Sequence, residues 1–101
     1  MKQFLIRYKF VNGSRAQWHQ SIAEFIANLD NDPELKGKIG YRCMCAGDDY
    51  FHIASPIDDA AVKTLQGREF FKRYTDKTKQ AGGGEVVVAP LEVIAETAYS
   101  P

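Results

Sequence analysis

Residues 39–55 read IGYRCMCAGDDYFHIAS, and this stretch decides the fold because it has the pattern of a β-hairpin. Aromatic and β-branched residues fill both arms, which favours two strands over a helix. Between the arms, Gly47 and Asp48 are residue types that tolerate the backbone angles of a tight turn. The stretch also holds both cysteines and one of the two histidines, so we expect any functional site to have a wall here.

The length of the turn determines which side chains share a face of the hairpin. A two-residue turn places Cys43 opposite His52, with Tyr41 on the same face. A three-residue turn shifts the pairing by one residue, and His52 then shares a face with Met44 instead. Hairpin statistics favour the two-residue turn, and the other register stays open at this point.

The chain before the hairpin predicts one strand and one helix. Apolar and aromatic side chains alternate from Phe4 to Val11, so one face of this strand should lie under helices. Ser14 and Gln17 have the form of a capping box, which predicts a helix from Ser14 to about Asp30. Helical spacing places His19 where we expect it to be solvated, and predicts a buried stripe of Trp18, Ile22, Phe25, Ile26 and Leu29.

The chain after the hairpin predicts two helical pieces and a last strand. Ser55 and Pro56 favour a helix start, with serine as the cap and proline in the first turn. Gly67 interrupts this helix, and a second piece follows over about residues 68–80. The glycine run at residues 82–84 precedes a strand, which indicates a helix stop rather than a phosphate-binding loop. The last strand extends to about Thr97 and contains Pro90, which fits the edge of a sheet.

These elements follow the order β, α, β, β, α, β within one expected domain, residues 1–101. The order predicts an α+β fold of the ferredoxin-like type, with a four-stranded antiparallel sheet and the helices on one face. The other face would carry Leu5, Met44 and Val87 beside basic residues, which is too apolar for a solvated surface. We therefore expect a second copy of the chain to cover it, which makes the protein a homodimer.

The composition argues against several classes of partner. Thirteen basic and thirteen acidic residues give a net charge of zero, so no overall charge favours nucleic acid or an anionic membrane. No apolar run reaches the roughly 20 residues of a membrane span, and the N-terminus lacks the apolar core of a signal peptide. We expect a cytoplasmic protein whose partner is a small neutral molecule or another protein.

The cysteine pattern indicates neither a disulfide nor a metal site. Cys43 and Cys45 lie two apart in one strand, where side chains point the same way but too far apart for relaxed disulfide geometry. Only His19 and His52 add nitrogen ligands, so we predict no metal. Reduced thiols that act as small packing residues are expected, with redox sensing or metal binding as the alternatives. Four cysteines, which an iron–sulfur electron carrier needs, are not present.

Nearly the whole chain contributes to a family resemblance. In order along it come the Trp and Phe stripe of the first helix, the hairpin YRCMCAGDDYFHIAS, the helix SPIDDAAVKTL, the segment REFFKRY and the closing strand VVVAPLEVIAET. Together they resemble the antibiotic biosynthesis monooxygenase type of dimeric α+β barrel. The resemblance implies a homodimer whose sheets pack face to face, with a pocket in each subunit between sheet and helices. Similar members of that family include cofactor-independent oxygenases of aromatic polyketides, haem-degrading enzymes, small isomerases and proteins of no known activity.

The residues that this chain lacks narrow the resemblance. Haem-degrading members use an asparagine on the first strand, with tryptophan and histidine deeper in the fold. Here the first strand has no asparagine, and the only tryptophan is on the first helix, so haem degradation is set aside. Quinone-forming oxygenases hold a phenolic substrate with tryptophan, tyrosine and arginine or asparagine groups, and the chain offers such types in Trp18, Tyr8, Tyr41 and Arg42.

The hairpin then leads to a hypothesis for the site. If its His52 face looks toward the helices, the histidine lies in a pocket with Tyr8 and Tyr41, walled by Phe70 and Tyr74. Neutral His52 would take a proton from a bound phenol or enol, because its unperturbed pKa lies near working pH. The electron-rich anion would then reduce oxygen without metal, flavin or other cofactor. The predicted substrate-binding residues are Tyr8, Trp18, Tyr41, Cys43, Phe70 and Tyr74.

Alternatives remain open for His52 and for the whole protein. The histidine is structural if a tyrosine hydroxyl or a backbone carbonyl satisfies it, or if it lies at the dimer interface. The protein is either a small cofactor-free monooxygenase or isomerase acting on an aromatic or enolisable metabolite, or a non-catalytic dimeric ligand-binding or stress-related module. An enclosed apolar pocket where His52 and a tyrosine converge favours the enzyme. The module is favoured by a pocket packed shut by Phe10, Phe25, Phe70 and Tyr74.

Overall fold

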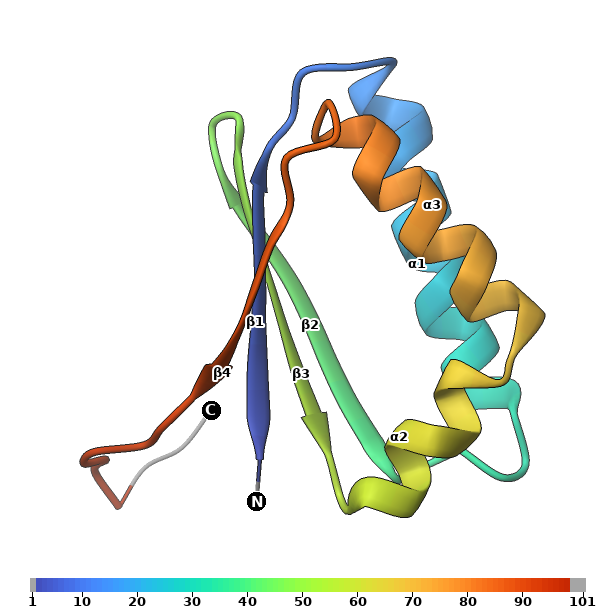
Figure 1. The fold of residues 1–101 in the computed structure, drawn as a ribbon, viewed down its shortest axis with the longest axis vertical. Helices are drawn as coiled ribbons and strands as arrows, with labels where there is room; N and C mark the ends of the chain where they lie inside the picture. The colour runs from blue at the N-terminus through green and yellow to red at the C-terminus, as the bar shows by residue number, and fades with distance from the viewer. Residues whose placement is uncertain (1, 99–101) are drawn as a thin grey trace.

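The structure is a computed structural model that describes residues 2–98. Among these residues lie four strands and three helices (Figure 1). Their bounds are β1 Gln3–Lys9, α1 Arg15–Asn31, β2 Ile39–Ala46, β3 Asp49–Pro56, α2 Asp59–Gln66, α3 Glu69–Ala81 and β4 Val87–Leu91.

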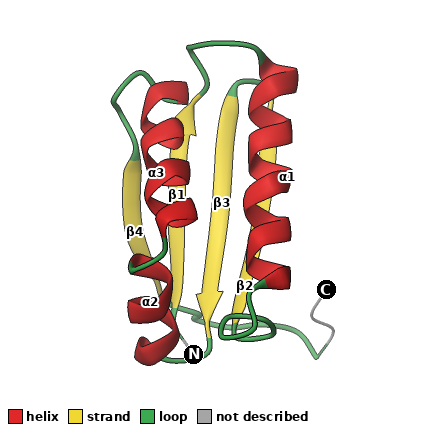
Figure 2. Cartoon of the chain, turned by 90° about the vertical axis from the view of Figure 1, so that its right-hand side faces the viewer, coloured by secondary structure: helices red, strands yellow, loops and turns green. Residues whose placement is uncertain are grey.

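The strands form one antiparallel sheet in the order β2-β3-β1-β4. All three helices cover the same face of this sheet, and the described chain places no helix on the other (Figure 1; Figure 2). The predicted α+β fold of the ferredoxin-like type is therefore confirmed. The order also places β4 at an edge, as Pro90 predicts, because proline has no N–H to donate to a further strand.

The β2–β3 hairpin has the two-residue turn at Gly47 and Asp48, so the favoured register is confirmed. Gly47 has a φ of 62°, and a positive φ at the first turn position is the pattern of a type II′ turn. Cys43 lies opposite His52 in this register. The face that carries them looks toward the helices, since Tyr74 of α3 reaches His52.

Two strands are shorter than the sequence predicts. β1 ends at Lys9 rather than Val11, because the Val11 amide donates to the carbonyl of Ala81 at the end of α3. β4 ends at Leu91 rather than near Thr97, because Leu91 pairs with the first residue of β1 and has no neighbouring strand beyond it. Both ends are determined by partners from distant parts of the chain.

The start of α1 agrees with the prediction, and the start of α2 does not. Ser14 caps α1 by accepting a hydrogen bond from the Gln17 amide, and the helix buries Trp18, Ile22, Phe25 and Leu29. For α2, the predicted cap Ser55 lies inside β3, which continues through Pro56. The cap is instead Asp58, whose carboxylate accepts a hydrogen bond from the Ala61 amide at 2.8 Å. Pairing of Pro56 with Ile39 of β2 keeps the chain extended past the predicted helix start.

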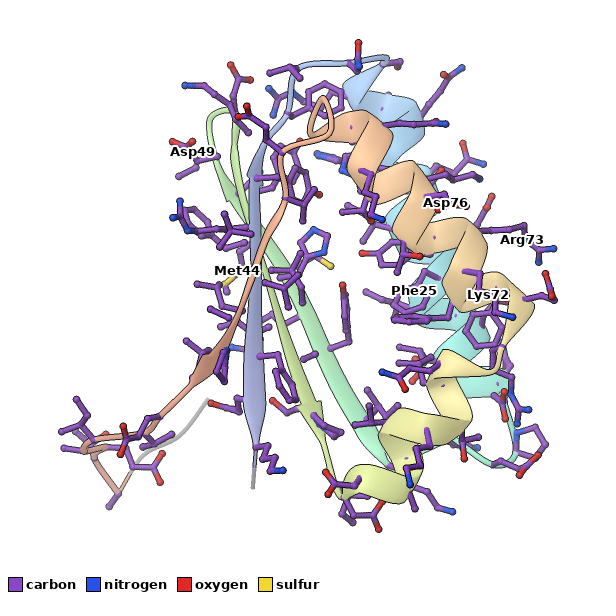
Figure 3. The ribbon with its side chains drawn as sticks, viewed as in Figure 1. Phe25, Met44, Asp49, Lys72, Arg73 and Asp76 are labelled. Atoms are coloured by element: carbon purple, nitrogen blue, oxygen red, sulfur yellow. The ribbon has the colours of Figure 1, made fainter. Side chains whose placement is uncertain are left out.

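The core lies between the helices and the sheet and consists largely of aromatic rings. Phe25 points from α1 into this layer (Figure 3), where its ring stacks on Tyr74 with the centroids 3.8 Å apart. Met44 lies on the opposite side of the sheet, with 42% of its surface exposed. Lys72, Arg73 and Asp76 line the outer surface of α3 (Figure 3). None of the helices described is both long and apolar enough to cross a bilayer.

Candidate active site

A cavity of about 400 Å³ lies between the sheet and the helices α2 and α3. Every strand of the sheet contributes to its wall, and most of the lining is apolar. Among its lining residues Lys79 is the charged one. The lining consists of Phe4, Ile6, Ile39, Tyr41, Ala54, Pro56, Val62, Leu65, Gln66, Phe71, Tyr74, Thr75, Thr78, Lys79, Val86 and Val88.

His52 lies beside this cavity, in the middle of β3, and its side chain has no exposed surface. Its Nε2 atom is 2.8 Å from the hydroxyl of Tyr8 on β1. Its Nδ1 atom is 3.0 Å from the hydroxyl of Tyr41 on β2 and 3.0 Å from that of Tyr74 on α3. Both ring nitrogens of the histidine therefore have tyrosine partners, and those partners come from three different elements.

The hydrogen bonds extend beyond the histidine. Trp18 of α1 donates its Nε1 proton to the Tyr8 hydroxyl at 2.8 Å. The hydroxyls of Tyr41 and Tyr74 are 3.1 Å apart, so these two groups also share a hydrogen bond. No buried side-chain nitrogen or oxygen of the described chain lacks a partner. Such a fully satisfied network holds its members in one arrangement, because breaking any bond leaves a buried polar group unpaired.

Burial keeps this cluster uncharged. It lowers the pKa of His52 to about 4, since the protonated ring loses its hydration. It raises the pKa of the Cys43 thiol to about 11, and it raises the pKa values of Tyr8, Tyr41 and Tyr74 above their ordinary range. At neutral pH the site therefore contains a neutral imidazole surrounded by neutral hydroxyls.

The predicted site residues other than Phe70 fall into three groups. Tyr41 and Tyr74 line the cavity and contact His52. Tyr8, Trp18 and His52 lie behind them and are not part of the lining. Cys43 pairs with His52 across the hairpin, and its sulfur is a hydrogen-bond partner of Tyr74.

Phe70 lies away from the large cavity. Its ring packs against Phe25, with the centroids 6.0 Å apart, and lines a second cavity of about 100 Å³ between α1 and α3. Of the four residues predicted to close the pocket, which are Phe10, Phe25, Phe70 and Tyr74, only Tyr74 borders the large cavity. These side chains therefore do not fill the large cavity.

Several lining residues were missed by the sequence analysis, although α3 carried a signal for some of them. Phe71 and Thr78 lie three and four residues from Tyr74 along α3, and Thr75 lies four residues from Phe71, so helical spacing places them on one side of the helix. Most of the remaining missed residues lie on the strands and on α2, such as Ile6 and Leu65. Val86, just before β4, and Val88 on β4 meet the others because the sheet order brings β4 beside β1.

A second polar cluster lies at the turn of the hairpin. His19, which the sequence predicts to be solvated, is exposed but also has its Nε2 atom 2.6 Å from the Tyr50 hydroxyl. Arg15 donates to the same hydroxyl at 3.0 Å and forms an ion pair with Asp48. These contacts hold the first turns of α1 against the turn end of the hairpin. Within residues 2–98 no three histidine, cysteine or acidic side chains gather in a way that would hold a metal ion.

This chain resembles known proteins in its structure. No protein-family model and no curated protein matches the sequence. SnoaB, a cofactor-independent oxygenase from Streptomyces nogalater, superposes with a TM-score of 0.74 at 14% identity, covering 97% of each chain. A protein described as an antibiotic biosynthesis monooxygenase gives a TM-score of 0.74 at 12% identity, covering 94% of this chain and 100% of its own.

A third neighbour is a dimeric ferredoxin-like protein of unknown function from Jannaschia sp. CCS1. It gives a TM-score of 0.62 at 21% identity, and the match covers 92% of this chain and 100% of that one. At identities this low, the likeness concerns the arrangement of the backbone. The chain therefore has the ferredoxin-like α+β fold that its structural neighbours, antibiotic biosynthesis monooxygenases among them, also have.

Proposed function

We propose that this protein is a cofactor-independent monooxygenase that acts on an aromatic or enolisable small metabolite. The observation that carries the proposal is a cavity of about 400 Å³ whose apolar lining includes the two tyrosines that contact His52. Apolar pockets of this size with a few convergent polar groups are typical small-molecule sites. The fold shared with the oxygenase SnoaB supports the same class of reaction.

The proposed reaction needs O₂ as its only co-substrate. Loss of a proton from a phenol or enol leaves an electron-rich anion, whose carbon can transfer electrons to O₂. One oxygen atom then forms a C=O bond at a C–H carbon of the substrate. The other oxygen atom leaves as water, with the hydrogen of that carbon and the hydrogen of the phenol. The product of a phenol is a quinone, and atoms and electrons balance without a reductant.

His52 belongs to this proposal through the two tyrosines rather than through direct contact with the substrate. The role of a base, which the sequence analysis predicts for it, stays a prediction. In this fold a proton would reach His52 only if a tyrosine hydroxyl carried it, because Tyr41 and Tyr74 stand between the imidazole and the cavity. The proposed substrate-binding groups in direct reach of a ligand are therefore these two tyrosines.

The second candidate function is a non-catalytic ligand-binding or stress-related module. It is favoured by the hydrogen bonds of His52, since both ring nitrogens are already satisfied by tyrosine hydroxyls. A histidine in such a network can be purely structural. The cavity would then hold a ligand without changing it.

We further propose that a second copy of the chain covers the bare face of the sheet. Leu5, Phe51 and Ile53 are half-buried there, and Met44 and Val87 are 42% and 45% exposed. A sheet face that water alone covers normally carries mostly polar side chains, so this composition favours burial against another apolar face. The Jannaschia neighbour with this fold is described as dimeric.

Oxygen consumption tests the proposed function. We would incubate the protein in air with 1-naphthol, a phenol, and with 2-tetralone, an enolisable ketone, and follow O₂ with an electrode. The proposal expects turnover without added metal or flavin, and ¹⁸O₂ should place one labelled atom in the product and one in water. Tyr74→Phe should slow turnover, whereas Tyr50→Phe should not, because Tyr50 lies outside the cavity. Binding of these compounds without O₂ uptake would support the module instead.

A further inference from the structure

The direction of the hydrogen bonds around His52 follows from which groups are able to donate. The indole nitrogen of Trp18 is only a donor, so the Tyr8 oxygen accepts from it. The proton of the Tyr8 hydroxyl then has one remaining partner, the Nε2 atom of His52 at 2.8 Å. Tyr8 is only 5% exposed, so water does not replace this acceptor. Nε2 of His52 must therefore accept, because a proton there would leave the Tyr8 hydroxyl buried without an acceptor.

The single proton of neutral His52 is consequently on Nδ1. This atom lies 3.0 Å from both the Tyr41 and the Tyr74 hydroxyl, and it donates toward those oxygens. The two hydroxyls are 3.1 Å apart, so one of them donates to the other. One hydroxyl proton of the pair is then left over. Within the described chain the sulfur of Cys43, a weak acceptor, is a hydrogen-bond partner of Tyr74 and not of Tyr41, so the left-over proton is assigned to Tyr74.

We propose that Tyr74 is the hydrogen-bond donor of the cavity, and that it binds a deprotonated enol or phenol oxygen of the substrate. This inference rests on the proposed function, because it takes the cavity to be the substrate site. It deepens that function by naming the ionised form as the form that binds. A hydrogen bond to an anionic oxygen is roughly twice as strong as one to a neutral oxygen, and an apolar lining strengthens it further.

The same geometry changes the role of His52 from a base to a positioning residue. With Nε2 accepting from Tyr8 and Nδ1 carrying the proton, the ring has no free lone pair for a substrate proton. Burial also lowers the pKa of His52 to about 4, so the neutral ring persists at neutral pH. His52 then determines in which direction the tyrosine protons point, and the substrate arrives already ionised or loses its proton to solvent.

Among the titratable groups that line the large cavity or contact Tyr74 beside it, only one could explain a preference for an anion. Glu24, Arg73 and Lys77 share the second cavity with Tyr74 and do not line the large one. Four neighbours of Tyr74 are neutral at neutral pH, because burial raises the pKa of the hydroxyls and the thiol and lowers that of the imidazole. They are Tyr41 and Cys43 of β2, Tyr8 of β1 and His52 of β3. The exception is Lys79 of α3, which lines the cavity and carries a positive charge. An ammonium group would also attract an anionic ligand, so the Lys79→Gln variant is the necessary control.

The proton arrangement is measured first, and without any ligand. The chain has two histidines, so ¹⁵N-histidine labelling gives few signals, and the His19→Gln variant identifies those of His52. The ¹⁵N shifts and the couplings to the ring carbons distinguish a proton on Nδ1 from one on Nε2. The inference expects the proton of His52 on Nδ1. A proton on Nε2 would overturn it, because one tyrosine hydroxyl would then donate to Nδ1 and the other to its neighbour, which leaves no hydroxyl proton for a ligand.

The ligand preference is measured with 4-nitrophenol, whose ionisation changes its absorption spectrum. Equilibrium dialysis over a pH range spanning this ionisation should show affinity that rises with pH, with the bound ligand as phenolate. The ether 4-nitroanisole should show no such dependence. Tyr74→Phe should weaken phenolate binding on the order of tenfold or more, as expected for a hydrogen bond to a charged group. Lys79→Gln should weaken it less.

Three outcomes separate this inference from the proposed function. Affinity that falls as 4-nitrophenol ionises would overturn the inference, because the cavity would then present an acceptor. A preference for phenolate that disappears in Lys79→Gln and persists in Tyr74→Phe would also overturn it. Phenolate binding that depends on Tyr74, without O₂ consumption on any substrate tested, would support the inference and defeat only the proposed function.

Discussion

At the residue scale, His52 is the most constrained side chain of the site. It has no exposed surface, and hydroxyls from β1, β2 and α3 surround its two nitrogens. A charged imidazole there would lose its hydration. It would also carry a proton on Nε2, which would leave the proton of the Tyr8 hydroxyl without an acceptor. The fold is therefore stable with neutral His52 and loses stability when the ring is protonated.

This constraint predicts how stability depends on pH. The pKa of His52 falls from 6.5 in the unfolded chain to about 4 in the fold, so between these values the unfolded chain binds more protons. The contribution is fully present above pH 6.5 and is lost as the pH falls toward 4. This contribution to the free energy of unfolding is about 3 kcal/mol, because a pKa difference of one corresponds to about 1.4 kcal/mol. Urea unfolding of the wild type at a series of pH values measures it.

Two variants isolate this contribution from that of the carboxylates. The His52→Gln variant has no imidazole, so its free energy of unfolding should fall less over the same pH interval, whatever its absolute stability. The His19→Gln variant should keep the wild-type dependence, because His19 is exposed. Identical pH dependence in wild type and His52→Gln would contradict a histidine that is buried and neutral.

At the scale of elements, the junction between β3 and α2 shows local signals in competition. Ser55 and Asp58 are both good helix caps, and Pro56 suits the first turn after Ser55. The structure selects Asp58, because β3 pairs with β2 as far as Pro56 and the Ile57 amide donates to the Lys38 carbonyl at 2.8 Å. The side chain of Ser55 instead accepts a hydrogen bond from Gln3 of β1.

Replacing each of the two candidate caps by alanine tests this assignment. Asp58→Ala should destabilise the protein by about 1 kcal/mol, the usual cost of losing a helix cap. Ser55→Ala should cost less, since it removes one half-buried hydrogen bond to a side chain near the edge of the fold. Chemical denaturation of both variants measures the difference. A larger loss for Ser55→Ala would show that the helix starts where the local sequence suggests.

At the scale of the whole molecule, the two faces of the sheet differ in what covers them. The helices cover one face and enclose the aromatic core and the cavity (Figure 2). The other face carries apolar side chains and no helix of the described chain. Burial of this face against a second copy would remove Met44 and Val87 from water, which is the main favourable term in such an association.

A charge introduced on the bare face should therefore dissociate the protein. We expect the wild type to sediment with twice the 11.3 kDa mass of one chain. The double variant Met44→Lys, Val87→Lys should sediment as a single chain with unchanged circular dichroism, because both side chains are already exposed within one chain. Ile57→Lys is the matched control, since Ile57 is 58% exposed but lies outside the sheet. A wild type that sediments as a single chain would refute the proposed dimer.

Local chemistry in the sequence determined most of the fold. Hairpin statistics at Gly47 and Asp48 favoured the register that the structure shows, although the sequence left the register shifted by one residue open. The stripe that begins at Trp18 predicted the buried side of α1 because of the repeat of the helix. The same patterns placed Tyr8 on the face under the helices, and in the favoured register they placed His52 and Tyr41 on one face of the hairpin; that this face also looks toward the helices was decided by the tertiary structure.

Only the tertiary structure decided what surrounds those residues. The meeting of the Tyr74 hydroxyl with His52, the exclusion of Phe70 from the large cavity and the position of the imidazole behind two tyrosines depend on how α3 docks on the sheet. The ends of β1 and β4 and the start of α2 depend in the same way on partners far along the chain. Local periodicity specifies which side of an element is buried, whereas the partner it is buried against follows from packing between distant segments.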